Sequence, residues 1–280
     1  MTVEQGKYID VNGIQTHYHE AGQGEPLLLI HGSGPGVTAW ANWRLAFPTL
    51  SEQYHLYAPD VVGFGNTERR EGQEYSIDVW VNHMIDFIET IGLPKVSVLG
   101  NSFGGAIALH LVNRRPDLVN KVILMGSVGN KSTLSDGLDA VWGYEPSFEN
   151  MKSLIETFAY DQSNAANSDL VEMRYQASIQ EGFQEAFSSM FPAPRQQHLD
   201  AMALSDDELR NIQAPVLLIH GREDKVIPLA ETSWKISQLI PNAQLHVFPH
   251  CGHWVQIEKT EQFIHQVLEF LSQPETADIV

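Results

Sequence analysis

The chain has 280 residues, of which 43% are hydrophobic and 19% are charged, and its formal net charge is −18. This length fits one large domain or one domain with an insertion, and the composition excludes global disorder. The strong negative charge argues against nucleic acid and anionic membrane surfaces as partners. An anionic small-molecule substrate would therefore need a local cationic pocket.

Other features of the sequence predict a cytoplasmic location. The single cysteine, Cys251, cannot form a disulfide within the chain, which fits a reducing compartment. The opening MTVEQGKYID has neither the basic nor the apolar region of a signal peptide. The longest apolar runs, such as LLLI, are far shorter than the ~20 residues of a membrane span. We expect no contact with a membrane.

Short apolar segments typical of strands alternate with segments of helical periodicity. The N-terminal stretch KYIDVNGIQTHYHEAG predicts a hairpin that turns at Asn12 and Gly13. The strand candidates that follow are apolar enough to be buried on both faces of a parallel sheet, and they span 26–32, 54–60, 95–100, 121–127, 214–221 and 243–249. Residues 76–91 and 103–115 have helical spacing, and Pro116 stops the second helix. This alternation indicates an α/β fold with a mainly parallel sheet.

Residues 130–209 interrupt the alternation. This segment is polar and helix-patterned, with turn signals at GYEPS and FPAPR and without a convincing buried strand. We interpret it as a helical cap, or lid, inserted between two strands of the core. The core then consists of residues 1–129 and 210–280.

The segment KVSVLGNSFGG places Ser102 in a G-x-S-x-G pattern between a predicted strand and a predicted helix. That is the context of a nucleophile elbow, where glycines allow a strained turn that exposes the serine. The bare pattern is expected by chance in roughly one chain in ten of this length. Its structural alternative is a tight strand–helix turn without a catalytic role.

Two further residues complete a catalytic triad in the order that an α/β-hydrolase uses. Asp224 follows the predicted strand VLLIHG, and His253 lies in PHCGHW after the last predicted strand. All three side chains would lie at carboxyl ends of strands, where chemistry gathers in open α/β sheets. We predict Ser102 as nucleophile, His253 as general base and then acid, and Asp224 as the group that orients the imidazole. His250 is the main alternative to His253.

An oxyanion intermediate needs N–H donors. One donor is expected from the backbone of Phe103, the residue after the nucleophile. The other is expected from Ser33 in the loop HGSGPG, where Gly32 and Gly34 keep the backbone open. The loop lacks the downstream Lys-Ser/Thr of a phosphate-binding loop, and no metal-ligand cluster stands out. We therefore expect no metal and no cofactor.

Three other reactive side chains near the predicted site have simpler interpretations. Asp60 also ends a predicted strand, but its chain order is wrong for the acid of the triad, so we interpret it as a residue that holds a loop. His31 directly precedes the glycine loop and is interpreted as a brace for it. Cys251 is interpreted as a small buried apolar residue and not as a second nucleophile.

The sequence resembles the α/β-hydrolase superfamily over nearly its whole length. Within it, HGSGPGVTAWANW, GNSFGGAIAL, GREDKVIP and HCGHWVQIE resemble the meta-cleavage product hydrolases, which are cofactor-independent C–C bond hydrolases of aromatic catabolism. The resemblance implies a small anionic substrate, a 2-hydroxy-6-oxohexa-2,4-dienoate. It is ketonised with proton transfer at C5 and then cleaved at C5–C6 to 2-hydroxypenta-2,4-dienoate and a carboxylic acid. Attack on C6 through an acyl-serine or through a gem-diol formed from water stays open.

The resemblance also implies roles for individual residues in substrate binding. Arg174 matches the cap arginine that holds the substrate carboxylate, a role that suits the planar fork of a guanidinium. Asn42 and Asn101 match asparagines at the polar end of the pocket, and Trp254 matches the aromatic residue after the catalytic histidine. Trp142 would narrow the far end of the pocket. A pocket narrowed in this way favours 2-hydroxymuconate semialdehyde or its 6-methyl ketone over a 6-phenyl substrate.

Two other functions stay open at this point. A carboxylesterase or a cofactor-free perhydrolase would use the same triad without needing Arg174 at the polar end of a pocket. A non-catalytic small-molecule receptor on the same fold would keep the triad with negligible turnover. The resemblance also implies a homo-oligomer, a dimer or larger.

Overall fold

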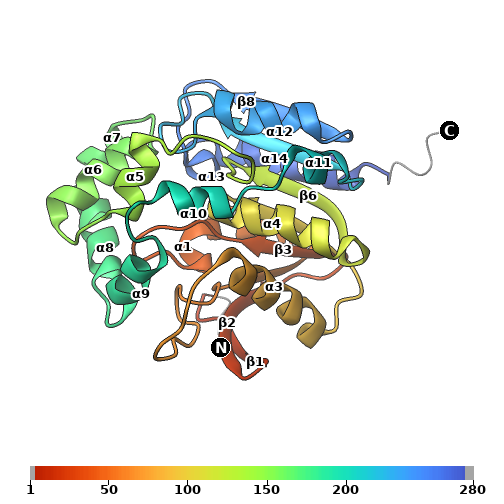
Figure 1. Ribbon diagram of the computed structural model, residues 1–280, viewed down its shortest axis with the longest axis horizontal. Helices are drawn as coiled ribbons and strands as arrows, with labels where there is room; N and C mark the ends of the chain where they lie inside the picture. Colours follow the sequence, from red (N-terminus) through yellow and green to blue (C-terminus); the bar gives the residue numbers. More distant parts are fainter. Residues whose placement is uncertain (1–3, 275–280) are drawn as a thin grey trace.

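The computed structural model describes residues 4–274, in which one central sheet is covered by helices on both faces (Figure 1). Its strands are β1 (Lys7–Val11), β2 (Ile14–Ala21), β3 (Pro26–Ile30), β4 (His55–Pro59), β5 (Val96–Asn101), β6 (Val119–Met125), β7 (Val216–Gly221) and β8 (Ala243–Phe248). They lie in the order β1-β2-β4-β3-β5-β6-β7-β8. β1 and β2 form the predicted hairpin, β2 pairs antiparallel with β4, and the pairs from β4 to β8 are parallel. The loops after β3, β5, β7 and β8 therefore meet at one edge of the sheet.

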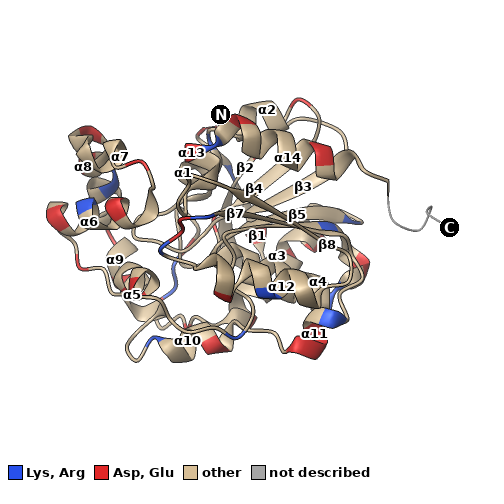
Figure 2. Ribbon diagram, turned by 90° about the horizontal axis from the view of Figure 1, so that it is seen from above, with Lys and Arg blue, Asp and Glu red and all other residues tan. Residues whose placement is uncertain are grey.

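Helices cover both faces of this sheet. One face carries α1 (Ala39–Trp43), α2 (Phe47–Leu50), α13 (Val255–Glu258) and α14 (Thr260–Ser272), and the other carries α3 (Ile77–Ile91), α4 (Phe103–Arg114) and α12 (Ser233–Leu239) (Figure 2). Two short 3₁₀ turns span Pro116–Leu118 and Leu229–Glu231. Figure 2 shows acidic residues spread over helices of the whole molecule, as expected for 35 Asp and Glu against 17 Lys and Arg.

Strand β3 shows why the sheet is buried on both faces. Leu27 and Leu29 pack into the core that contains the apolar residues of α1, α2 and α14. Leu28 and Ile30 point the other way, into the core beneath α3 and α4. Successive side chains of a strand alternate between faces, so an unbroken apolar run fits only a strand with helices on both sides.

Helix α3 begins and ends as its sequence predicts. Ser76 caps its N-terminus by accepting a hydrogen bond from Val79 N at 3.3 Å, and Gly92 ends it in the left-handed conformation with φ +81°. Between these ends, Trp80 and Phe87 are among the residues that it buries at helical spacing against the sheet. The apolar face thus holds α3 in place beneath β1 and beside α4.

The strand predicted at 121–127 differs from β6 by two residues at each end. β6 begins at Val119 because Val119 pairs with Val96 at the start of β5. It ends at Met125 because the next residue, Gly126, has φ +51°, outside the extended range. The predicted strand at 26–32 likewise ends at Ile30, where the glycine loop begins.

The segment between β6 and β7 is helical, as the sequence predicts. Its helices are α5 (Asp136–Trp142), α6 (Phe148–Phe158), α7 (Ser163–Ala166), α8 (Ser168–Ser178), α9 (Phe183–Met190), α10 (Gln196–Ala201) and α11 (Asp206–Arg210). Helices α5 to α9 gather at one end of the molecule (Figure 1), whereas α11 packs against α12. The division into a core (1–129 and 210–280) and a cap (130–209) stays an interpretation. In residues 4–274, no helix combines the length and apolar character that crossing a membrane requires.

Candidate active site

Ser102 lies at a sharp turn between β5 and α4. Its φ of +54° and ψ of −116° form a backbone conformation that is strained for a residue with a side chain. Ser102 N donates a hydrogen bond to Met125 O at 2.8 Å, which ties the turn to β6. A Cβ at Gly104 would lie 2.4 Å from Ile30 O, and one at Gly100 would lie 2.4 Å from Gly104 O. Glycine is therefore required on both sides of the serine, as the elbow interpretation expects.

Asp224 and His253 meet across the loops that follow β7 and β8. His253 Nδ1 donates a hydrogen bond to Asp224 Oδ2 at 2.7 Å. The other carboxylate oxygen, Oδ1, accepts from the backbone N–H groups of Val226 and Ile227, both at 2.8 Å. His220 Nε2 lies 3.4 Å from Oδ2. These contacts fix the carboxylate so that it orients the imidazole of His253.

The surroundings keep Asp224 ionised. Burial alone would raise the pKa of Asp224, but the neighbouring His253 and the hydrogen bonds from His220 and His253 outweigh it and hold that pKa well below its usual range. His250, the alternative base, instead lies with its Nδ1 3.1 Å from the hydroxyl of Tyr160. The geometry therefore favours His253 as the base.

The glycine loop after β3 lies against Ser102, the predicted nucleophile. A Cβ on Gly32 would lie 3.3 Å from Cβ of Ser102, whereas one on Gly34 would have nothing within 4 Å. Within residues 4–274, no hydrogen bond engages the backbone N–H of Ser33 or of Phe103. Both N–H groups are free to bind an oxyanion, which is the role that the sequence predicts for them.

Asn42 connects this loop with the residue before the nucleophile. Its Oδ1 accepts hydrogen bonds from Asn101 Nδ2 at 2.7 Å and from Gly32 N at 3.2 Å. Asn42 Nδ2 and Asn101 Oδ1 are buried and have no hydrogen-bond partner within the described residues. Buried polar atoms without partners are costly, so this donor and this acceptor are available to a ligand.

Arg174 and Trp254 line a cavity of about 570 Å³ that Asn42 and Gln256 also border. Arg174 Cζ lies 5.8 Å from the centroid of the Trp254 ring. Burial, with the nearby charge of Arg44, lowers the pKa of Arg174 to about 10, so the guanidinium stays charged at neutral pH. Arg174 Nε and Gln256 Oε1 are buried without partners among the described residues. The cavity therefore offers an unpaired cation next to the asparagine cluster.

Comparison with known proteins identifies the family. The chain matches the model of the α/β-hydrolase fold over residues 25–260. It is 51% identical over 272 residues to the 2-hydroxy-6-oxo-2,4-heptadienoate hydrolase of Pseudomonas putida, covering 97% of this chain and 98% of the relative. It is 48% identical over 276 residues to the 2-hydroxymuconate semialdehyde hydrolase of a Pseudomonas species, covering 99% and 97%.

A solved structure agrees with this family assignment. The meta-cleavage product hydrolase CumD of Pseudomonas fluorescens, a serine-to-alanine variant complexed with acetates, superposes with a TM-score of 0.94 at 50% identity and covers 96% of this chain and 98% of its own. The chain belongs to the meta-cleavage product hydrolases. The predicted α/β-hydrolase fold and family are thereby confirmed, and the chain is a serine-dependent C–C bond hydrolase.

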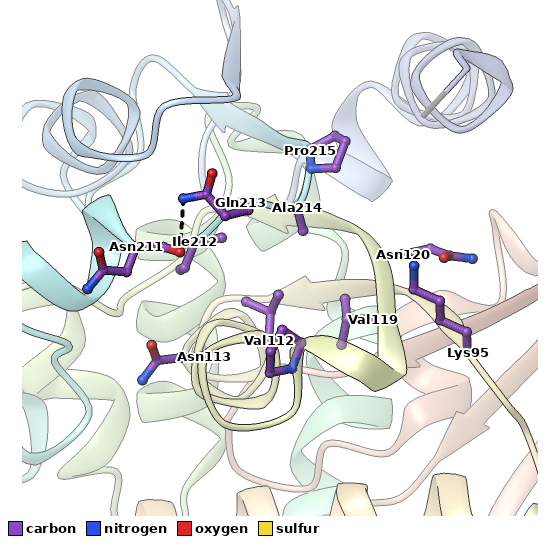
Figure 3. A pocket seen from close by; sticks show the side chains of 11 residues that line it. Lys95, Val112, Asn113, Val119, Asn120, Asn211, Ile212, Gln213, Ala214 and Pro215 are labelled. Carbon is purple, nitrogen blue, oxygen red and sulfur yellow. Dashed lines mark hydrogen bonds between the residues drawn. The ribbon is translucent and has the colours of Figure 1, made fainter. Parts of the chain in front are cut away.

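This meta-cleavage product hydrolase has another cavity, of about 410 Å³. Figure 3 shows the side chains that line it. Lys95, Val119 and Pro215, which line it, lie where β5, β6 and β7 begin. Because Ser102 lies at the carboxyl end of β5, this cavity is not part of the predicted active site.

The loop residues near the hydrolase site behave as interpreted. Asp60 accepts hydrogen bonds from Ala39 N at 2.6 Å and from His17 Nδ1 at 2.8 Å, so it joins α1 to β2. His31 Nδ1 donates to Gly32 O at 2.7 Å, which braces the glycine loop. Burial raises the pKa of Cys251 to about 12, which leaves its thiol protonated and inert at neutral pH.

Sequence reasoning misses two residues of the site. The ring of Phe158, at the end of α6, stacks on the rings of His253 and Trp254 at centroid distances of 5.7 and 5.0 Å. Nothing in the sequence distinguishes Phe158 from the other apolar residues of an amphipathic helix. Gln256 carries a weak signal, because it is a polar residue between the apolar neighbours of HWVQIE.

Proposed function

We propose that this enzyme hydrolyses the C5–C6 bond of 2-hydroxymuconate semialdehyde or its 6-methyl ketone, giving 2-hydroxypenta-2,4-dienoate and formate or acetate. The observation that carries the proposal is the half-buried guanidinium of Arg174, whose Nε is buried without a partner, beside Asn42, whose side chain contacts the residue before Ser102. A substrate with a carboxylate at one end and its reacting carbonyl at the other fits this arrangement. The names of the relatives at 48–51% identity describe hydrolases of such dienoates.

Substrate binding would begin with the carboxylate. The fork of Arg174 can take it in two parallel charge-assisted hydrogen bonds, with the Trp254 ring beside the guanidinium. The free Nδ2 of Asn42 can donate to the adjacent 2-oxo group. Together these groups stabilise the negative charge that forms at this end of the substrate when the C5–C6 bond breaks.

Catalysis would follow in two stages. The dienol first becomes a ketone: the 2-hydroxyl loses its proton and C5 gains one. The C6 carbonyl is then attacked by Ser102, or by a water that His253 deprotonates, and the oxyanion is bound by the N–H groups of Ser33 and Phe103. When C5–C6 breaks, its electron pair moves through the conjugated chain to the oxygen on C2, which gains a proton. On the Ser102 route the acyl group stays on the serine until a water deprotonated by His253 releases it as the carboxylic acid. The 2-oxo group thus makes carbon a tolerable leaving group.

The preference for a small C6 group rests on Trp142. Its buried indole, at the end of α5, donates a hydrogen bond to Ser33 Oγ at 3.0 Å and stacks on Phe191 at a centroid distance of 4.3 Å. A side chain held from two sides cannot move aside easily for a phenyl ring beside the oxyanion donors. Hydrogen or methyl at C6 fits this arrangement better.

The alternatives are less favoured. A carboxylesterase or perhydrolase needs the triad but not an unpaired arginine in the adjoining cavity. A non-catalytic receptor has no need for the hydrogen-bonded pair of Asp224 and His253. A homo-oligomer and a cytoplasmic location stay predictions, supported by the family resemblance and by the single buried cysteine.

The test uses three substrates that differ only at C6, namely hydrogen, methyl and phenyl. Loss of the yellow dienolate is followed by stopped-flow absorbance with the wild type and with Ser102→Ala. We expect kcat/KM to be highest for hydrogen or methyl and turnover to be lost in the variant. A higher kcat/KM for the phenyl compound would contradict the specificity. No decay with any of the three would contradict the proposed reaction.

A further inference from the structure

We propose that Glu258 is a positioning residue that fastens the loop of the catalytic histidine to the cap. Two short segments meet at this residue: the histidine loop (residues 249–254) and the tail of α6 (residues 158–161). They lie almost a hundred residues apart in the chain, as the separation of 97 between Asp161 and Glu258 indicates. Glu258 itself ends α13, directly after the histidine loop.

The two oxygens of one carboxylate join the two segments. Glu258 Oε1 accepts a hydrogen bond from Asp161 N at 2.8 Å, in the tail of α6. Glu258 Oε2 accepts one from Gly252 N at 2.7 Å, in the histidine loop. Hydrogen bonds from a backbone N–H to an ionised acceptor are about twice as strong as those between neutral groups.

Direct backbone contact between the segments makes this junction sensitive to small shifts. His253 N donates a hydrogen bond to Phe158 O at 2.7 Å. A Cβ on Gly252 would lie 2.4 Å from Phe158 O and 2.8 Å from Tyr160 N, so only glycine fits there. Because the Phe158 ring also stacks on His253, a displaced α6 tail would displace the imidazole with it.

A second carboxylate, that of Glu223, holds the other side of the histidine loop. Glu223 Oε2 accepts a hydrogen bond from Cys251 N at 3.1 Å, and Glu223 N donates to Cys251 O at 3.0 Å. This pair joins the histidine loop to the loop of Asp224. The contact between Asp224 and His253 therefore has its own support, and Glu258 instead sets the base relative to the cap.

The consequence for catalysis concerns kcat more than substrate affinity. Arg174 and Asn42, the groups proposed to hydrogen-bond the substrate, make no hydrogen bond with Glu258. Trp254 shares the histidine loop but is proposed to contact only the guanidinium of Arg174, so substrate affinity should change less than kcat. An imidazole displaced by about 1 Å can lower the rate of proton transfer roughly a hundredfold. This inference rests on the proposed function only in taking Ser102 and His253 as the reacting pair.

The test compares Glu258→Ala and Glu258→Gln with the control Glu261→Ala, an exposed residue of α14. Three quantities are measured: kcat and KM for the 6-methyl dienoate, the rate at which a fluorophosphonate labels Ser102, and Tm. We expect Glu258→Ala to lower kcat and the labelling rate together, about 10- to 100-fold, with KM within about twofold. Glu258→Gln keeps one acceptor oxygen, so its kcat and labelling rate should lie between those of Glu258→Ala and the wild type. The control Glu261→Ala should match the wild type.

Two results would overturn the inference. Wild-type kcat and labelling rate with a lower Tm would show that Glu258 only stabilises the fold. A change confined to KM would show that it acts on substrate binding. If Glu258→Ala does not fold, Glu258→Gln carries the same comparison, because it keeps the volume of the side chain. A wild type that is labelled but leaves the dienoate intact contradicts the proposed substrate, and the labelling rates still decide the role of Glu258.

Discussion

Trp142 of α5 donates its indole N–H to Ser33 Oγ across 3.0 Å, so the predicted cap touches the loop that carries a predicted oxyanion donor. The same ring stacks almost parallel on Phe191, at an interplanar angle of 7°. This single side chain therefore joins the predicted cap to the loop of the predicted oxyanion donor Ser33. Both the volume of Trp142 and its hydrogen bond should therefore influence which C6 group the enzyme prefers.

Replacing Trp142 by alanine should shift the preference toward large C6 groups. The freed volume should raise the ratio of kcat/KM for the 6-phenyl over the 6-methyl substrate at least about tenfold, within the range that pocket size alone can achieve. Trp234→Ala is the matched control, because Trp234 is 54% exposed on α12. An unchanged ratio in Trp142→Ala would mean that Trp142 does not face the C6 group.

Loss of the Arg174 guanidinium should impair only substrates that carry a carboxylate. Arg174→Gln should lower kcat/KM for the dienoate about 100-fold, because a charge-assisted bidentate contact is lost. Arg174→Lys should recover part of this, since lysine supplies the charge without the fork. Hydrolysis of a neutral aryl ester, measured beside it, should stay within about threefold of the wild type. An equal loss on both substrates would indicate a structural role for Arg174.

Removing the charge of Asp224 should disable the base without unfolding the site. Asp224→Asn leaves a side chain of the same shape but favours the wrong tautomer of His253, so kcat should fall about 10⁴-fold, as the same substitution does in a Ser-His-Asp protease. Circular dichroism checks that the fold is kept. His250→Asn, at the alternative base, should leave kcat within about twofold. The reverse pattern would move the role of base to His250.

The buried pair of Asp60 and His17 should make stability depend on pH. Burial alone would raise the pKa of Asp60, but the hydrogen bond from His17 and the nearby His31 lower it below its usual range. Burial alone would lower the pKa of His17, but Asp60 and a backbone carbonyl raise it. The ionised Asp60 thus stabilises the fold at pH values above its ordinary pKa of ~3.9. The protonated His17 does so at pH values below its ordinary pKa of ~6.5.

The largest difference between the wild type and Asp60→Asn should therefore lie between about pH 4 and 6.5. There the substitution should cost about 3 kcal/mol of unfolding free energy, because it leaves a buried imidazolium without its partner. The difference should shrink as pH falls through the lowered pKa of Asp60 or rises through the raised pKa of His17. Urea unfolding at three pH values measures it, and a difference independent of pH would contradict the ion pair.

The elements that sequence predicts best are those whose evidence is local. The elbow at Ser102 could be predicted because its sequence pattern lies within one strand–turn–helix unit, although the requirement for glycine at position 104 comes from the neighbouring strand β3. Asp224 and His253 could be predicted because each follows a recognisable apolar strand, and parallel strands bring their carboxyl ends together. The ends of β6 differ by two residues from those that the sequence predicts, because pairing with β5 and the turn at Gly126 decide them.

The contacts between cap and core could not be predicted. Phe158 reads as one more apolar residue of an amphipathic helix, and Glu258 as one more acidic residue in a chain with 35 of them. The roles of both residues depend on contacts between segments that lie far apart in the chain, and no local sequence pattern predicts such contacts. Arg174 could be singled out only by resemblance, because the burial of its Nε without a partner is a property of the folded chain.

The most direct test of the central claim is to identify the products from the 6-methyl dienoate by NMR. The account predicts equal amounts of acetate and 2-hydroxypenta-2,4-dienoate from the wild type, and neither from Ser102→Ala. An intact carbon chain after incubation with the wild type, together with rapid hydrolysis of a simple aryl ester, would contradict C–C bond cleavage while leaving the triad in place.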